Sequence, residues 1–357
     1  MLESVGTADA AALRAIRQLV PGAIQDAARL VYQAPSELRS GLRPDAAAEM
    51  QGLLERLGFR VSVRDSDAAF HAGVGQFEIA LVVRDMNVIG AVIAEAASFL
   101  GTDLPTARRL VCRSPAVLVS RVSEATVAAV RDRFGRLGVE VDVSRSSLAR
   151  YCAVIAADNP AVRRAVLSVV QDIASDAVVI ETTAALIVEN FSFDAAEACW
   201  ERLRRTGARV SICNRDFERY DVSLDEAPNT PAVRELLVGA GVPARLIDRV
   251  LRNVPVIVQR HVSHAEMQTL LDRAAGAGAL ASALPHSFQR FAIILRSIKD
   301  AANAARLLVT LGDMSEGAAA SAVATVNTPI GNFPRTTALW LQHLLATQGC
   351  DAAIEVL

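Results

Sequence analysis

The chain has 357 residues, of which 52% are apolar and only 4% are Phe, Trp or Tyr. Its 37 Lys and Arg residues nearly balance 39 Asp and Glu residues, and Lys299 is the only lysine. A protein that binds nucleic acid by general electrostatic attraction is clearly basic, so the charge balance argues against that class. The high apolar content, with 21% charged residues, excludes a disordered chain.

The sequence lacks the usual features of an exported or membrane protein. The N-terminal residues include early acidic ones and show no apolar core of a signal peptide. The most apolar stretches are shorter than the roughly 18–20 residues that a membrane-spanning helix needs. The cysteines are odd in number and show no C-x-x-C spacing, which favours a reducing cytoplasm: Cys112, Cys152, Cys199, Cys213 and Cys350. We therefore expect a cytoplasmic protein with no membrane span.

Three sequence markers recur with a period of about 70 residues, which predicts tandem modules. Aromatic residues open short apolar runs at Phe77, Tyr151, Tyr220 and Phe291. Glycines separate a charged helical segment from a strand-like one at Gly58, Gly138, Gly207, Gly278 and Gly349. Serines suited to cap a helix stand at Ser123, Ser192 and Ser263. The markers predict five modules, at residues 1–64, 76–145, 150–214, 219–285 and 290–357, which we call modules 1 to 5.

Module 1 is expected to lack its opening strand. Counting back from Gly58 by the distance between Phe77 and Gly138 places that strand before Met1. Either another segment fills the position, or the module has an open sheet edge. An unpaired edge strand is a common route to pairing with another chain, so self-association through this edge is one expectation.

Module 2 shows the predicted elements of one repeat in chain order. A strand opens at Phe77, and a helix from Val88 to Leu100 ends at Gly101. A shorter helix follows, from Leu104 to about Cys112, and Pro115 closes it. A second strand, a third helix capped by a serine and a last strand complete the unit. The same proline stands at Pro35 and Pro255, Pro329 is the nearest match in module 5, and Thr183 takes the position in module 3.

Each module is therefore expected to be a β-α-α-β-α-β unit. Its three strands would form an antiparallel sheet with the helices on one face, which is an α+β fold. The linkers between modules are short, apart from residues 65–76, so neighbouring modules should pack against each other.

Module 2 resembles the C-terminal domain of the bacterial ribosomal stalk protein, a fold that is also similar to the peptide-binding adaptor of the Clp protease. The resemblance depends on Phe77, Val92–Ile93, Gly101, Ala107–Val111, Pro115, Val122–Ser123 and the G-x-E-V-x-V ending. It implies no catalytic activity, and recruitment of translation GTPases through basic residues on the first two helices. Of the matching positions here, Arg108 keeps its charge, whereas the others hold Ile89, Ala94, Ala97 and Pro105.

Arginines are the candidate partner-binding residues. Arg29, Arg109 and Arg249 share one repeat position, six residues before the proline. A second group is expected on the last helix of module 3: Arg202, Arg204, Arg205 and Arg209. One interpretation is a solvated helix face paired with nearby acids such as Glu197 and Glu201. The other is docking of an acidic protein surface, with Arg108, Arg109, Arg29, Arg249, Arg202 and Arg205 as the contact residues.

Other chemistry has weak support in the sequence. His261 and His264 are three residues apart but have no Cys or carboxylate partner nearby, so we expect no metal site. No nucleotide-binding or hydrolase motif occurs, and we expect neither cofactor nor catalysis. The favoured function is a scaffold or adaptor that binds proteins through tandem modules. The alternatives are a protein associated with translation factors or the ribosome, and an enzyme with a cleft between modules.

Overall fold

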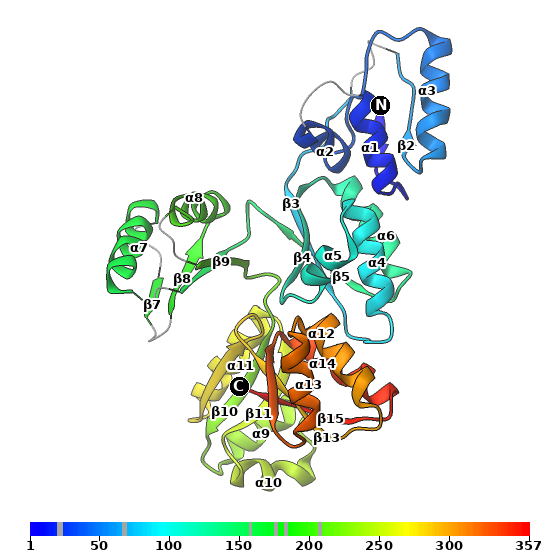
Figure 1. The fold of residues 1–357 in the computed structure, drawn as a ribbon. Helices are drawn as coiled ribbons and strands as arrows, with labels where there is room; N and C mark the ends of the chain where they lie inside the picture. The colour runs from blue at the N-terminus through cyan, green and yellow to red at the C-terminus, as the bar shows by residue number, and fades with distance from the viewer. Residues whose placement is uncertain (20–23, 66–69, 157–158, 175–177, 182–184, 206–208) are drawn as a thin grey trace. The chain divides into compact units, whose positions relative to one another are not determined.

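The structure is a computed structural model that describes residues 1–19, 24–65, 70–156, 159–174, 178–181, 185–205 and 209–357 (Figure 1). These residues form two compact units, Met1–Ala149 and Arg150–Leu357, and each is described by itself. The described chain is a mixture of helices and small antiparallel sheets, which confirms the predicted α+β class with repeated sheet modules.

The first unit contains modules 1 and 2. Module 1 consists of β1 (Leu2–Ser4), α1 (Ala10–Leu19), α2 (Ile24–Tyr32), α3 (Pro44–Arg56) and β2 (Arg60–Val61). Module 2 consists of β3 (Phe77–Val82), α4 (Ile89–Leu100), α5 (Leu104–Val111), β4 (Ala116–Val122), α6 (Glu124–Gly135) and β5 (Glu140–Arg145).

The second unit contains modules 3 to 5. Module 3 consists of β6 (Tyr151–Ala156), α7 (Pro160–Ile173), β7 (Val178–Glu181), β8 (Ala185–Phe191), α8 (Phe193–Leu203) and β9 (Arg209–Asn214). Module 4 consists of β10 (Tyr220–Glu226), α9 (Pro231–Gly239), the 3-10 turn η1 (Ala244–Leu246), α10 (Ile247–Arg252), β11 (Val256–Val262), α11 (His264–Gly276) and β12 (Leu280–Pro285). Module 5 consists of β13 (Phe291–Ser297), α12 (Ala301–Gly312), α13 (Glu316–Ala324), β14 (Pro329–Phe333), α14 (Arg335–Thr347) and β15 (Asp351–Val356).

The opening strand of each complete module is a central strand of its sheet. The strand orders are β4-β3-β5, β7-β8-β6-β9, β11-β10-β12 and β14-β13-β15, with every pairing antiparallel. Alternate residues of the opening strand face the helices, as the pleat of a strand requires. In module 5, Phe291, Ile293 and Leu295 enter one buried cluster with Leu308 of α12 and Leu341 of α14.

The local markers act as predicted. The side chains of Ser123, Ser192 and Ser263 accept hydrogen bonds from backbone N–H groups in the first turns of α6, α8 and α11. Gly101 ends α4 with a positive φ of 68°, a conformation that costs glycine little. Gly207 and Thr183 lie outside the described residues.

The proline position is shared by three modules. The peptide bonds before Pro35, Pro115 and Pro255 are all cis. In module 5, Pro329 pairs with Ile294. The counterparts of Ile294 in modules 2 and 4 are Ala80 and Ser223, and their partners lie two residues after Pro115 and Pro255. Pro329 is therefore not the counterpart of these prolines. The proline match proposed for module 5 is therefore wrong by two residues.

Two predictions about individual modules need correction. Module 1 does not lack its opening strand entirely, because β1 pairs with β2 and Leu2 bridges to Ser36. The sequence count missed it because only three residues remain and none is aromatic. In module 3 the strand β7 stands where a second helix was expected, so the sheet has four strands. The β-branched run at Val178–Ile180 favours a strand over a helix.

Candidate protein-interaction sites

The predicted arginines are spread over several modules. Arg29 of α2, Arg109 of α5 and Arg249 of α10 are exposed, and they stand on three different modules. Arg109 donates a hydrogen bond to the Thr106 hydroxyl at 3.0 Å, one turn away on the same helix. Arg108 is half-buried and already engaged in an interaction. These arginines remain candidates for contact with a partner.

The arginines of module 3 are partly paired with local acids. Arg202 contacts Asp172 of α7 at 3.0 Å, and Arg204 contacts Glu201 at 2.6 Å. Arg205 is exposed and follows the end of α8, and Arg209 begins β9, so the expectation that all four lie on one helix is wrong. The helix α8 ends at Leu203, so Arg204 is its C-cap residue and Arg205 lies beyond it. Exposed ion pairs of this kind stabilise a protein by about 0–1 kcal/mol.

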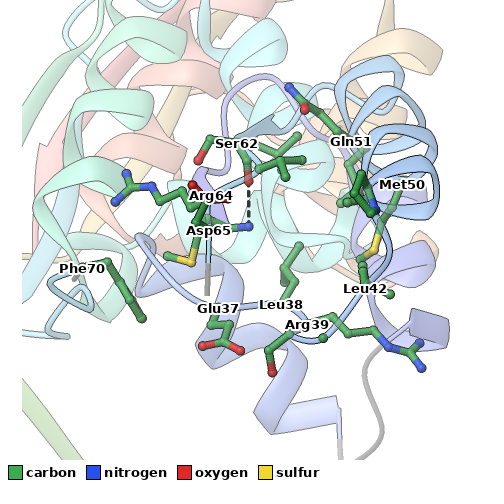
Figure 2. A pocket seen from close by; sticks show the side chains of 18 residues that line it. Glu37, Leu38, Arg39, Leu42, Met50, Gln51, Ser62, Arg64, Asp65 and Phe70 are labelled. Carbon is green, nitrogen blue, oxygen red and sulfur yellow. Dashed lines mark hydrogen bonds between the residues drawn. The ribbon is translucent and has the colours of Figure 1, made fainter. Parts of the chain in front are cut away.

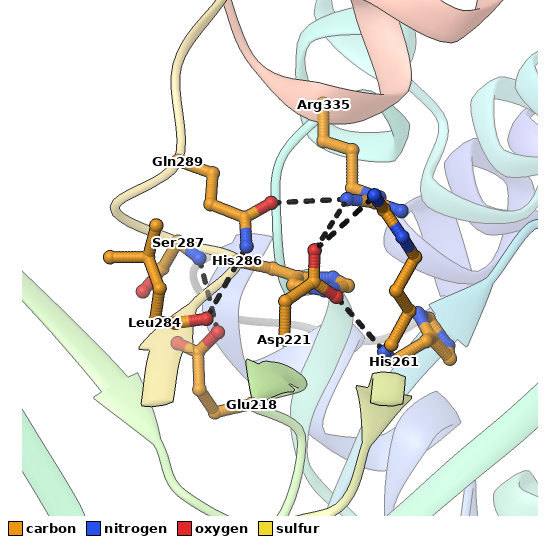
Figure 3. Close-up of polar contacts among 9 residues, drawn as sticks. Glu218, Asp221, His261, Leu284, His286, Ser287, Gln289 and Arg335 are labelled. Carbon is orange, nitrogen blue, oxygen red and sulfur yellow. Dashed lines mark hydrogen bonds and ion pairs between the residues drawn. The ribbon is translucent and has the colours of Figure 1, made fainter. Parts of the chain in front are cut away.

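A buried polar cluster joins modules 4 and 5 (Figure 3). The carboxylate of Asp221, the second residue of β10, lies 2.8 Å from Nε2 of His286. Arg335, the first residue of α14, donates to the same carboxylate at 3.2 Å and to the side-chain oxygen of Gln289 at 3.1 Å. The backbone N–H of His261 adds a third donor at 3.1 Å. The Asp221 side chain is only 4% exposed and that of His286 only 2%.

The electrostatics of this cluster fit a structural role in holding modules 4 and 5 together. We call Asp221, His286, Gln289 and Arg335 the clamp. Burial opposes ionisation of Asp221, but hydrogen bonds from His286 and His261, together with Arg335, outweigh it and hold the pKa of this carboxyl well below its usual range. The carboxylate therefore stays charged, and its oxygens are already occupied by donors. Such an arrangement can fix α14 of module 5 against the sheet of module 4, since removing one partner leaves a buried charge uncompensated.

The linkers on either side of module 4 contact each other. Glu218, in the linker before β10, accepts a hydrogen bond from the backbone N–H of Ser287 at 3.0 Å and one from the Cys213 thiol at 3.3 Å. Arg215, in the same linker, donates to the side-chain oxygen of Asn190 at 2.6 Å and contacts the His264 ring. His261 and His264 therefore have different partners. The His264 ring contacts Arg215, whereas the centroid of the His261 ring lies 5.2 Å from that of His286.

Module 1 packs on module 2 through its proline-bearing loop. The carbonyl of Tyr32 accepts hydrogen bonds from Ser123 N–H at 3.0 Å and from the Thr126 hydroxyl at 2.9 Å. The Tyr32 hydroxyl donates to the carbonyl of Phe99 at 2.9 Å, and burial raises the pKa of Tyr32 to about 12. Arg133 of α6 donates to the carbonyl of Ala8 at 2.8 Å. These contacts fix module 1 on the helices of module 2.

A pocket of about 490 Å³ lies within module 1 (Figure 2). Its walls are residues 37–42 and residues 61–65, and α3 contributes the apolar floor. Met1 lies at one end, where it exchanges backbone hydrogen bonds with Ser62 at 2.9 and 3.0 Å. We call the space between residues 37–42, residues 62–65 and α3 the strand slot.

The strand slot occupies the position that the opening strand fills in module 2. An offset of 80 residues aligns the two modules, since it matches Pro35 with Pro115 and Gly58 with Gly138. With that offset, residues 37–42 correspond to β4 and residues 62–65 correspond to the end of β5. Both β4 and β5 pair with β3, the opening strand of module 2. Among the described residues, neither residues 37–42 nor residues 63–65 make the backbone hydrogen bonds of a sheet.

The side chains around the strand slot are correspondingly less buried than their counterparts. Val127 and Val130 of α6 are buried, whereas Ala47 and Met50 of α3 at the same positions are half-buried. Val63 on the second wall is 52% exposed. The described part of module 1 therefore contains the floor and both walls of a sheet site, with β1 at one end of the central strand position.

Two further observations bear on site chemistry. Within the described ranges, no group of three or more His, Cys, Asp or Glu side chains converges as metal ligands do. None of the helices in the described part of the chain is both long and apolar enough to cross a membrane.

The fold and sites together define an α+β protein built from repeated antiparallel modules, with polar junctions between modules and an open strand position in module 1. No family model, curated protein or solved structure matches the chain.

The repeat pattern predicts an open sheet edge in module 1, whereas no local pattern predicts the Asp221 cluster between modules 4 and 5. The available signals were the acidic residue after Tyr220, repeated after Phe77, and the polar linker containing His286 and Gln289.

Proposed function

We propose that the chain is a non-enzymatic scaffold that binds proteins, with the strand slot of module 1 as its docking site. The observation that carries this proposal is a pocket with an apolar floor and two walls, residues 37–42 and 63–65, that make no sheet hydrogen bonds among the described residues. Backbone N–H and C=O groups left without partners favour pairing with another strand. The resemblance of the modules to the ribosomal stalk domain supports a role in recruiting proteins, and the buried, unbridged cysteines support a cytoplasmic location.

The two other polar clusters described above lie at junctions between modules, where their side chains already have partners within the chain. Asp221, His286 and Arg335 are committed to holding modules 4 and 5 together. The contacts of Tyr32 and Arg133 do the same for modules 1 and 2. Rigid junctions suit a scaffold, because they fix the spacing of the modules along each unit.

Two proline variants test the docking site. The Met1–Ser62 hydrogen bonds show that the backbone of Ser62 faces the central strand. In an antiparallel sheet, the backbone N–H and C=O groups of successive residues point alternately toward and away from the neighbouring strand. The N–H of Arg64 therefore faces the strand slot, as that of Ser62 does, and the N–H of Val63 faces away. Arg64→Pro removes both the backbone N–H and the guanidinium of Arg64 from the slot, and Val63→Pro is the control because the N–H of Val63 faces away.

The full-length chain and both variants are used to capture proteins from an extract of the native host, and each captured protein is then tested in purified form. We expect a purified partner that binds the wild type and Val63→Pro but loses at least about tenfold in affinity for Arg64→Pro. A partner that binds both variants equally well would place the docking site elsewhere and contradict the proposal.

A further inference from the structure

We infer that the strand slot recognises an extended segment of a partner protein with an aromatic, an acidic and an aliphatic residue in succession. This inference rests on the proposed docking function and adds the chemistry of the segment. The segment would lie between the two walls as a central strand, antiparallel to both, in the direction of β3 in module 2.

The strand register defines how many positions are open. Leu2 pairs with Val61 and bridges to Ser36, just as Leu81 pairs with Val141 and Ala116. Met1 therefore takes the place of Ala80. The walls continue past Met1 along three strand positions, which Phe77, Glu78 and Ile79 fill in module 2.

The floor of the slot favours an aromatic residue at the first position and an aliphatic one at the third. In all four complete modules the first residue is aromatic, and the third is aliphatic: Ile79, Ala153, Val222 and Ile293. The first and third residues of a strand face the same side of the sheet, here the side covered by the helices. Ile79, Val222 and Ile293 are fully buried there. In module 1 the matching floor consists of Ala47, Met50 and Leu54, of which Met50 can adapt its shape to an aromatic ring.

The walls favour an acid at the second position. In module 2, Glu78 accepts a hydrogen bond from Ser120 at 2.9 Å, and Ser40 is the matching residue on the first wall of the slot. Directly opposite Glu78 on β5 is Ser144, and Arg64 is its counterpart on the second wall. The side chain of Arg64 is 39% exposed and contacts Glu3 at 2.8 Å. An incoming carboxylate would thus meet a hydroxyl on one side and a guanidinium on the other.

Module 4 shows the same preference in a filled sheet. Its second opening residue is Asp221, which is buried and contacts Arg335 and, at 3.8 Å, Arg260 of the neighbouring strand. Two of the four complete modules therefore place an acid after the aromatic residue, and the acid of module 4 contacts arginine. In module 1 the corresponding arginine is Arg64, whose guanidinium would meet an incoming acid by sharing or exchanging its contact with Glu3.

Fluorescence anisotropy with labelled peptides tests the motif on the full-length chain. The probe carries Phe-Glu-Ile between flexible flanks (KGSFEISGK), and the matched probe carries Phe-Lys-Ile. We expect the first probe to bind with a Kd below about 100 μM and the second to bind at least about tenfold more weakly. Val63→Pro should bind the first probe as the wild type does, and Arg64→Pro should lose binding.

A charge exchange provides the decisive control. Arg64→Glu should reverse the order of preference, so that the Phe-Lys-Ile probe binds more tightly than the Phe-Glu-Ile probe. Absence of binding by the Phe-Glu-Ile probe up to about 1 mM, or equal binding of both probes, would overturn the motif. If a captured partner still depends on Arg64 as described above, the docking function stands and only the motif fails.

Two other occupants of the slot would also overturn the inference. A concentration-dependent dimer that Arg64→Pro dissociates, measured by analytical ultracentrifugation, would assign the slot to a second copy of the chain. Intact mass spectrometry of the protein from its native host could instead reveal residues that precede Met1 in a strand-forming pattern. Such residues would fill the slot from within the chain.

Discussion

Modules 1 and 2 are two copies of one fold that differ in a single strand. In module 2 the opening strand contributes six residues, and both neighbouring strands pair with it along their length. In module 1 the same strand contributes three residues, and the walls beyond it are left without sheet partners among the described residues. Two floor positions that are buried in module 2 are half-buried in module 1, at Ala47 and Met50, while Leu54 stays buried. The comparison shows that the repeat keeps its frame when its opening strand is reduced to three residues.

The largest expected effect comes from the second position of the opening strand in a complete module. Asp221→Asn should lower the free energy of unfolding of the second unit by about 3–5 kcal/mol, because it removes the charge that His286 and Arg335 surround. The control Asp248→Asn alters an acid that is 64% exposed and should change stability by less than about 1 kcal/mol. Urea denaturation monitored by circular dichroism measures both variants.

The effect of Asp221 should also depend on pH in a defined direction. Its pKa is lowered in the folded state, so its stabilising contribution is complete above the unfolded pKa of about 3.9 and is lost as the pH falls below it. The difference between wild type and Asp221→Asn should therefore be constant from neutral pH to about pH 5 and shrink in more acidic buffer. A difference that grows as the pH falls would contradict the clamp.

The next largest effect is a difference in stability between a substitution in β3 of module 2 and one on the wall of the strand slot in module 1. Ile79→Ala in β3 deletes a fully buried side chain and should cost module 2 about 2–4 kcal/mol. Val63→Ala, on the exposed wall of the strand slot, should change the stability of module 1 by less than about 0.5 kcal/mol. Hydrogen exchange, read separately for residues 77–82 and 60–65, measures both. Comparable costs at the two sites would mean that the wall of module 1 is already packed.

Filling the strand slot covalently should give a smaller gain in stability. Adding the residues Phe-Glu-Ile directly before Met1 buries an aromatic and an aliphatic side chain but orders three residues, for a net gain of about 1–2 kcal/mol in module 1. The same extension should abolish binding of the Phe-Glu-Ile probe. An extension of Gly-Ser-Gly is the control and should leave both properties unchanged. If the extended chain still binds the probe with full affinity, the probe does not occupy the slot.

The smallest expected effect concerns the exposed arginines. Arg29→Ala, Arg109→Ala and Arg249→Ala should each change stability by less than about 0.5 kcal/mol, because the side chains are exposed. They should also leave binding of the Phe-Glu-Ile probe unchanged, since none of them lines the strand slot. A loss of probe binding in any of these variants would shift the docking site to the helices.

The sequence alone predicts the number of modules and most of their elements, because aromatic, glycine and serine markers report local conformation. It fails at β7, where the repeat suggests a helix but the β-branched run Val178–Ile180 favours a strand. The clamp was not predictable, because Asp221 lies 65 residues from His286 and 114 from Arg335. Such contacts depend on how two modules pack, which no local pattern encodes. The strand slot was only partly predictable, since the repeat count placed the opening strand before Met1 and did not reveal that Leu2–Ser4 pair with β2.

The central claim is that module 1 has an open strand position, and hydrogen–deuterium exchange of the full-length chain tests it most directly. Without peptide, the amides of residues 37–42 and 63–65 should exchange quickly, while those of residues 116–122 and 140–145 in module 2 are protected by β3. Adding the Phe-Glu-Ile probe should slow exchange at residues 37–42 and 63–65 and leave module 2 unchanged. If the two walls of module 1 are as protected as the strands of module 2 before any peptide is added, the position is already filled and the account is wrong.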